Sequence, residues 1–141
     1  MDSRFLLVQA GEKHVGLAMD PLIEVIDMVV PFAVPSTAPA LRGVIPVRGR
    51  LVPVFHLGAA LDGGGCPSAL GEMAVVATLD GRRICLEVDH AVEVTTDAVR
   101  PLPDDHDMPG AVGVVQRDGL FIPIIDLAAL APTIIERGMA S

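Results

Sequence analysis

The sequence predicts an all-β fold of two small five-stranded barrels with few short helices. The chain has 141 residues, the size of a single domain. Its composition is 51% hydrophobic and 20% charged, so it has enough apolar side chains to bury a core. These apolar residues occur in short runs separated by turn residues, and such runs are typical of β-strands.

Ten apolar runs divide into two sets of five. Turns that contain glycine, such as Asp80-Gly81, separate several of them, as in β-hairpins. The predicted strands of the first set are Phe5–Ala10, Val15–Met19, Ile23–Val30, Val44–Val47 and Leu51–Phe55. Those of the second set are Met73–Leu79, Ile84–Val88, Val92–Thr95, Val112–Gln116 and Leu120–Ile125.

An internal repeat relates the two sets. Residues 5–26 align without gaps with residues 74–95, and residues 43–61 with residues 113–131, giving 10 identities in 41 aligned positions. Several identities are Gly, Pro or Asp, whose backbone preferences matter most at turns. We therefore predict a single domain, 1–141, made of subdomain one at about 1–62, subdomain two at about 72–131 and a C-terminal tail at 132–141.

Signals for helices are few. Leu57–Leu61 and Leu127–Leu130 each predict about one helical turn after the last strand of a set. Asp20-Pro21 looks like a helix N-cap followed by proline, which predicts a further short turn. Thr133 and Glu136 have the spacing of a capping box, which predicts a short terminal helix.

The composition argues against several classes of function. Ten Lys and Arg against 18 Asp and Glu give a net charge of −8, which repels nucleic acid and anionic lipid. The chain has no Trp or Tyr with which to stack bases. Its most apolar stretch, residues 120–135, is shorter than the ~20 residues of a membrane-spanning helix. Because the N-terminal apolar run is also too brief for a signal peptide, we expect a cytoplasmic chain.

The sequence offers little for catalysis. The four histidines and two cysteines show no paired spacing typical of a metal site, so we predict no metal and no cofactor. Cys66 and His56 could form a nucleophile and its base, but no third group is identifiable that would orient them. We therefore predict no catalytic residue and keep a Cys66/His56 enzyme as the alternative from another class.

His56 has an unusual counterpart in the repeat. The alignment places it opposite Asp126, and both residues follow the last strand of their set and precede a predicted helical turn. We therefore predict that His56 caps or hydrogen-bonds the adjoining turn. A hydrogen bond of this kind contributes about 1 kcal/mol to stability.

The run from Leu41 to Arg50 concentrates positive charge in an acidic chain. Arg42, Arg48 and Arg50 flank two glycines there. Arginine is enriched at protein interfaces because its planar guanidinium binds carboxylates, so the run predicts a site for an acidic partner. The alternative is that these arginines only keep a hairpin end solvated. We expect structural turns at Gly43, Gly49, Gly113 and Gly119.

The segment LRGVIPVRGRLVPVFHL, residues 41–57, resembles the signature of the CheW family of chemotaxis coupling proteins. FLLVQAGEKHVGLAMDPLIEVI resembles the family's opening strands, GRRICLEVDHAVEV its second-half turn, and GVVQRDGLFIPIIDLAAL its closing strand pair. The resemblance runs from about Phe5 to Leu130, with the motifs in the family's order. The chain departs from the family at His56, where Asp is usual, and at Pro46, where Asn is frequent.

This resemblance implies two five-stranded SH3-like barrels and a non-enzymatic adaptor. Such an adaptor links the regulatory domain of a CheA-type histidine kinase to the cytoplasmic tip of methyl-accepting chemoreceptors, with no nucleic acid and no membrane insertion. By position it implies that Arg48, Leu22, Glu24 and Val94 bind the receptor, and we include Arg42 from the same arginine run. The alternative is a CheW-like adaptor of a type IV pilus or another kinase array.

Overall fold

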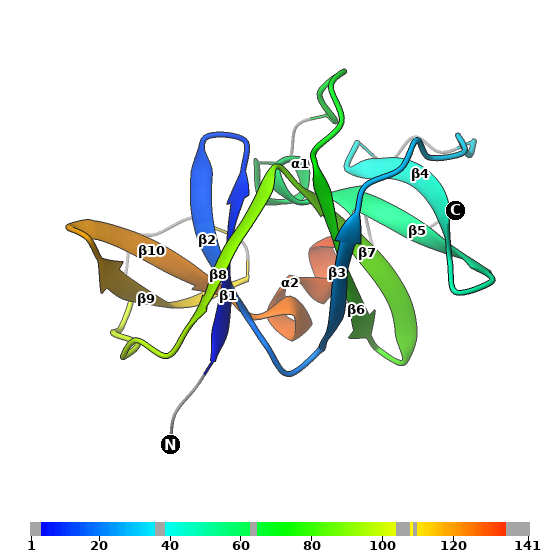
Figure 1. The fold of residues 1–141 in the computed structure, drawn as a ribbon. Helices are drawn as coiled ribbons and strands as arrows, with labels where there is room; N and C mark the ends of the chain where they lie inside the picture. Colours follow the sequence, from blue (N-terminus) through cyan, green and yellow to red (C-terminus); the bar gives the residue numbers. More distant parts are fainter. Residues whose placement is uncertain (1–3, 36–38, 63–64, 104–107, 109, 135–141) are drawn as a thin grey trace.

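The described residues form ten strands and two short helices (Figure 1). The computed structural model describes residues 4–35, 39–62, 65–103, 108 and 110–134. The first five strands are β1 (Phe5–Ala10), β2 (Lys13–Ala18), β3 (Leu22–Asp27), β4 (Leu41–Val47) and β5 (Arg50–His56). The others are β6 (Met73–Leu79), β7 (Arg82–Val88), β8 (His90–Thr95), β9 (Ala111–Arg117) and β10 (Leu120–Ile125). The helices are α1 (Leu57–Asp62) and α2 (Leu127–Ile134).

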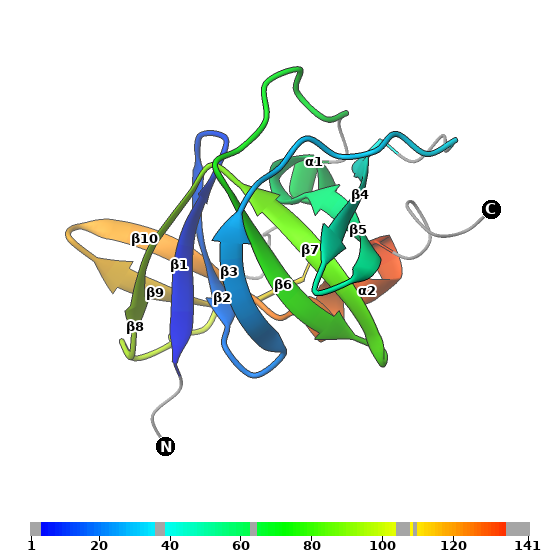
Figure 2. The same cartoon turned by 45° about the vertical axis from the view of Figure 1, so that its right-hand side comes forward.

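The strands form two five-stranded sheets, which confirms the all-β fold class. Sheet A has the order β8-β1-β2-β10-β9, and sheet B has the order β3-β6-β7-β5-β4. Figure 1 shows sheet A on the left and sheet B on the right, and Figure 2 shows the same arrangement from another side. Both predicted helical turns after β5 and β10 are present as α1 and α2.

The two sequence halves do not each form one sheet. Sheet B is built from one continuous stretch, residues 22–88, whereas sheet A combines residues 5–18 with residues 90–125. The ranges 1–62 and 72–131 therefore mark the two copies of the repeat but not the two sheets. The physical reason is that apolar alternation decides which face of a strand is buried but not which strand lies beside it, so the repeat alone does not assign strands to sheets.

Two parallel strand pairs join the halves at equivalent positions. In sheet A, Ile124 of β10 pairs with Gly16 of β2. In sheet B, Val54 of β5 pairs with Cys85 of β7. All other strand pairs are antiparallel. The repeat therefore relates the two sheets to each other: the parallel pair of sheet A corresponds to the parallel pair of sheet B.

In each sheet, the segment after one edge strand, here called the crossing segment, pairs with the strand at the opposite edge. After β3, Phe32 forms a two-way backbone bridge with Val44 of β4. After β8, Arg100 forms the corresponding bridge with Val114 of β9. These bridges bring the two edges of each sheet together, as expected for small barrels.

The crossing segments explain two glycines that we expected in turns. Gly43 and Gly113 lie inside β4 and β9 and not at turns, so that prediction is wrong. A Cβ atom on Gly43, whose φ is 148°, would meet the carbonyl oxygen of Phe32. A Cβ atom on Gly113 would meet the side chain of Val99. Close passage of the crossing segment, and not chain reversal, requires glycine at these two positions.

The other two predicted turns are present. Gly49 and Gly119 follow β4 and β9 with φ of 82° and 80°. Asp20-Pro21, in contrast, begins no helix, because β3 starts at Leu22 and pairs with β6. Helix α2 runs to Ile134 and so includes the first residues of the predicted tail, while the rest of the predicted terminal helix, through Glu136, lies outside the described residues.

The described residues form three buried clusters. The largest takes side chains from both sheets and both helices, among them Leu17, Phe55, Leu86 and Leu130. A smaller cluster inside sheet B comprises Ile45, Val47, Val52, Val54, Ala74, Val76 and Cys85. The third, inside sheet A, comprises Phe5, Leu7, Val115, Ile122 and Ile124. Burial of apolar surface in the shared cluster fixes one sheet against the other.

Candidate protein-binding surface

Arg48 stands at the tip of the β4–β5 hairpin. It has φ of 50° and is followed by Gly49, so both central residues of the turn have positive φ, as in a type I′ turn. The equivalent turn residues in the β6–β7 and β9–β10 hairpins are Asp80 and Asp118, a residue type that tolerates this conformation better than arginine. The backbone therefore holds Arg48 at a conformational cost, and its side chain is 70% exposed.

Glu24 of β3 fixes the guanidinium of Arg48. The Nε atom of Arg48 donates to Oε1 at 3.2 Å, and Nη2 donates to Oε2 at 2.5 Å. These hydrogen bonds lower the pKa of Glu24 and raise the pKa of Arg48. The structure thus brings two of the predicted site residues together, and the two-point contact orients an arginine that is largely exposed to solvent.

The remaining predicted residues of this surface lie on the edge strands of the sheets. Leu22 of β3 is partly buried and packs against the shared core. Its neighbours Ile23 and Val25 are the exposed apolar residues of that strand, and the sequence analysis did not single them out. Val94 is exposed on β8, the edge strand of sheet A.

Arg42 has a different environment from Arg48. Its side chain is 11% exposed, and its Nε and Nη2 atoms donate to Glu87 at 2.7 and 3.0 Å. Nη1 and Nη2 also donate to the carbonyl oxygens of Pro67 and Ala69. Because its donors are already engaged inside the protein, Arg42 ties the segment before β6 to the sheet and is not available to a partner.

Glu87 is the buried residue that sequence reasoning missed. It is fully buried in β7 and accepts hydrogen bonds from Arg42 and from the backbone N–H of Gly71. A single carboxylate inside the apolar run ICLEV was the available signal, because a buried charge needs a partner.

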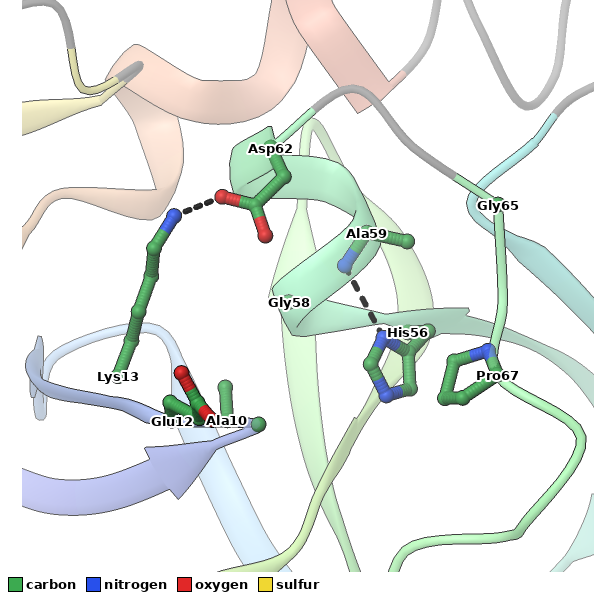
Figure 3. A pocket seen from close by; sticks show the side chains of 10 residues that line it. Ala10, Glu12, Lys13, His56, Gly58, Ala59, Asp62, Gly65 and Pro67 are labelled. Atoms are coloured by element: carbon green, nitrogen blue, oxygen red, sulfur yellow. Dashed lines mark hydrogen bonds and ion pairs between the residues drawn. The ribbon is translucent and has the colours of Figure 1, made fainter.

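His56 caps helix α1, as predicted. Its Nδ1 atom accepts a hydrogen bond from the N–H of Ala59 at 3.0 Å (Figure 3). At the equivalent position, Oδ1 of Asp126 accepts from the N–H of Ala128 at 3.0 Å. Burial lowers the pKa of His56, and an imidazole that accepts at Nδ1 carries its proton at Nε2.

A cavity of about 300 Å³ lies beside His56, between the β1–β2 turn and helix α1. Figure 3 shows the Lys13–Asp62 ion pair on one side of it and His56 with Pro67 on the other. The charged side chains that line the cavity include Glu12, Lys13 and Asp62. The charge of Lys13 is already paired with that of Asp62.

The geometry gives no support to a Cys66/His56 enzyme. The thiol of Cys66 donates to the carbonyl oxygen of Pro39 at 3.3 Å, and burial raises the pKa of that thiol. The Nδ1 atom of His56 is occupied by the N–H of Ala59. Neither side chain is therefore arranged as the thiolate or the base of a reacting pair.

The described residues contain neither a metal-binding cluster nor a membrane-spanning helix. No group of three or more His, Cys, Asp and Glu side chains among them could hold a metal ion. No helix in the described part of the chain is long and apolar enough to cross a membrane.

Comparison with known proteins identifies the family. The model of the CheW-like domain matches residues 4–134. The fold is similar to the crystal structure of the scaffolding protein TtCheW from Thermoanaerobacter tengcongensis, with a TM-score of 0.79 and 24% identity over 92% of this chain and 88% of that one. A search of curated proteins gave no match. With the family model covering almost the entire chain, this protein belongs to the CheW-like domain family.

Proposed function

We propose that this chain is a non-enzymatic adaptor that couples a CheA-type histidine kinase to the cytoplasmic tip of chemoreceptors. Membership of the CheW-like family supports a scaffold role. The observation that carries the receptor assignment is the exposed Arg48, held by Glu24 on an unfavourable backbone conformation. The proposed partners place its action in the cytoplasm.

The proposed receptor surface combines this ion pair with apolar side chains. Ile23 and Val25 flank Glu24 in β3 and are exposed on the opposite face of that edge strand, because side chains alternate along a strand. Val94 is exposed on β8, the edge strand of the other sheet. We propose that the receptor contacts the β3 edge on both faces, because arginine and apolar side chains together are typical of interfaces. Leu22, at the start of β3, packs against the shared core and so anchors this strand.

An adaptor needs a second surface, and we assign the kinase to sheet A. The β9–β10 hairpin exposes Val112, Leu120 and Phe121, the last at 63%. These residues lie on the sheet opposite to the one that carries Arg48. Exposed aromatic and aliphatic side chains of this size are typical of protein-binding sites.

Substitution of Arg48 tests the receptor assignment. Arg48→Ala should weaken binding of a receptor-tip fragment at least tenfold, because a hot-spot arginine contributes ~2 kcal/mol or more. Its melting temperature should stay within a few degrees of the wild type, since exposed ion pairs add little stability. Binding to the kinase regulatory domain should change much less.

A matched control is Arg100→Ala, which removes an exposed arginine from sheet A. Isothermal titration calorimetry with both partners and circular dichroism for stability suit a chain without Trp or Tyr. Unchanged receptor affinity for Arg48→Ala would refute the assignment. A collapsed melting curve would instead make Arg48 a structural residue.

A further inference from the structure

Of the three further arginines at the same end of sheet B as Arg48, Arg82 lies on the opposite face of β7 from Arg83, and the other two are Arg50 and Arg83. Arg50 begins β5 immediately after the turn and pairs with Val47. Arg83 lies near the start of β7 and pairs with Thr78 of β6. Figure 1 shows the β4–β5 and β6–β7 turns at the lower end of this sheet. Both arginine side chains are exposed.

Strand alternation shows on which face these arginines lie. Side chains two residues apart share a face of a strand. Arg50 is two residues before Val52, and Arg83 is two residues before Cys85, and both of those residues belong to the buried cluster inside sheet B. The two arginines therefore lie at the open end of this cluster.

Glu24 lies at the same end and links the group. It is two residues before Ile26, which packs against the same cluster. Its pKa is lowered first by the hydrogen bond from Arg48 and also by the positive charge of Arg83. Glu24 pairs with Val76 of β6, a member of this cluster, and burial together with the negative charge of Glu24 raises the pKa of Cys85 to about 11.

The charge at this end is positive in an acidic protein. Arg48 binds the carboxylate of Glu24, Arg83 acts on it through its charge, and Arg50 follows the turn that carries Arg48. These three arginines are here named the arginine rim, and Asp80 adds one more carboxylate at the β6–β7 turn. Within the part of the chain that the structure describes, neither Arg50 nor Arg83 forms an ion pair. Two guanidinium groups thus remain available to a partner.

We propose that the arginine rim binds acidic side chains of the receptor tip, with Arg50 and Arg83 receiving carboxylates while Glu24 holds Arg48. This inference rests on the proposed receptor function and names the chemistry of the partner. Arginine suits this role because its planar guanidinium binds a carboxylate at two points.

A protein partner fits this surface better than an anionic membrane. The whole chain has a net charge of −8, which opposes approach to a lipid surface. Glu24 and Asp80 lie among the arginines, so the surface suits discrete carboxylates at fixed positions better than a continuous sheet of negative charge.

The test is the double variant Arg50→Glu/Arg83→Glu, compared with Arg4→Glu/Arg100→Glu. The control makes the same change in charge at two exposed arginines outside the rim. Affinity for a receptor-tip fragment is measured at about 0.01 M and about 0.15 M salt, where the Debye length falls from about 30 Å to about 8 Å. The rim variant should bind at least tenfold more weakly than the control at low salt, with less dependence on salt. Its kinase affinity should match that of the wild type.

The outcomes separate this inference from the proposed function. Equal receptor affinity of the rim variant and the control would overturn the rim and leave the adaptor role intact. If the wild type does not bind the receptor fragment, the proposed function itself fails. If the wild type binds phosphatidylserine vesicles and the rim variant does not, the rim recognises lipid and the inference is wrong.

Discussion

Replacing Arg42 with alanine should destabilise the protein by about 3–5 kcal/mol, the usual cost of leaving one member of a buried ion pair without its partner. The structure justifies this magnitude because Glu87 is fully buried and would keep only the N–H of Gly71 as a donor. The carbonyl oxygens of Pro67 and Ala69 would also lose the guanidinium. For a chain of this size each kcal/mol corresponds to roughly 3 °C, so the melting temperature should fall by about 9–15 °C.

Urea unfolding followed by circular dichroism measures this effect. The double variant Arg42→Ala/Glu87→Gln should recover about 1 kcal/mol or more, because a neutral amide is cheaper to bury than an unpaired carboxylate and still accepts from Gly71. Arg48→Ala gives the contrast of an exposed ion pair, with an expected loss below about 1 kcal/mol. If Arg42→Ala costs no more than Arg48→Ala, the buried pair is not structural and Arg42 returns to the partner surface.

Two other residues give predictions about stability. Because burial lowers the pKa of His56 in the folded state, stability should fall as the pH drops below about 6.5, the pKa of an unfolded histidine. His56→Asn keeps a cap that does not titrate, so its urea midpoint between pH 7.5 and pH 5.5 should change less than that of the wild type, and an equal change would contradict the assignment. Gly43→Ala should lose about 1–3 kcal/mol from backbone strain alone and more from contact with Phe32, whereas Gly49→Ala, whose Cβ would meet open space, should lose less. Equal decreases in melting temperature for the two glycine variants would contradict this prediction and show that the segment around Phe32 moves away from the new Cβ atom.

The apolar runs and the repeat carried most of what the sequence could predict. Apolar runs between turn residues predicted the ten strands, and the repeat related the two sets and placed His56 opposite Asp126. That correspondence predicted a helix cap from two different residue types, which the hydrogen bonds of both side chains confirm. Local chemistry was enough here because a cap involves neighbouring residues only.

Strand pairing between the halves could not be predicted in the same way. Gly16 and Cys85 occupy equivalent positions in the repeat and pair with Ile124 and Val54 from the opposite copy. Apolar alternation states which face of a strand is buried but not which strand lies beside it. The same limit applies to Arg42, whose partner Glu87 lies 45 residues away in the sequence.

The arginines show how tertiary context separates similar residues. Arg42 and Arg48 lie six positions apart in one motif, yet one is engaged in the interior and the other is exposed at a turn. Arg83 was not a candidate, because no residue near it in the sequence indicates that it lies beside the turn between β4 and β5. Only the order of strands in sheet B brings it to the end where Arg50 lies.

The insertion of sheet B within sheet A sets an order on folding. Every pairing of sheet B joins residues between 22 and 88, whereas sheet A needs contacts such as Leu6 with Val94, which close a much longer loop. Loop-closure entropy therefore favours completion of sheet B first, which then brings the ends of sheet A together. During synthesis the β1–β2 hairpin emerges early and waits for β8 and β10, the strands that cover its two edges. In that interval, or in a chain truncated before β8, both edges are free to pair with another molecule, so incomplete chains are the species most exposed to aggregation.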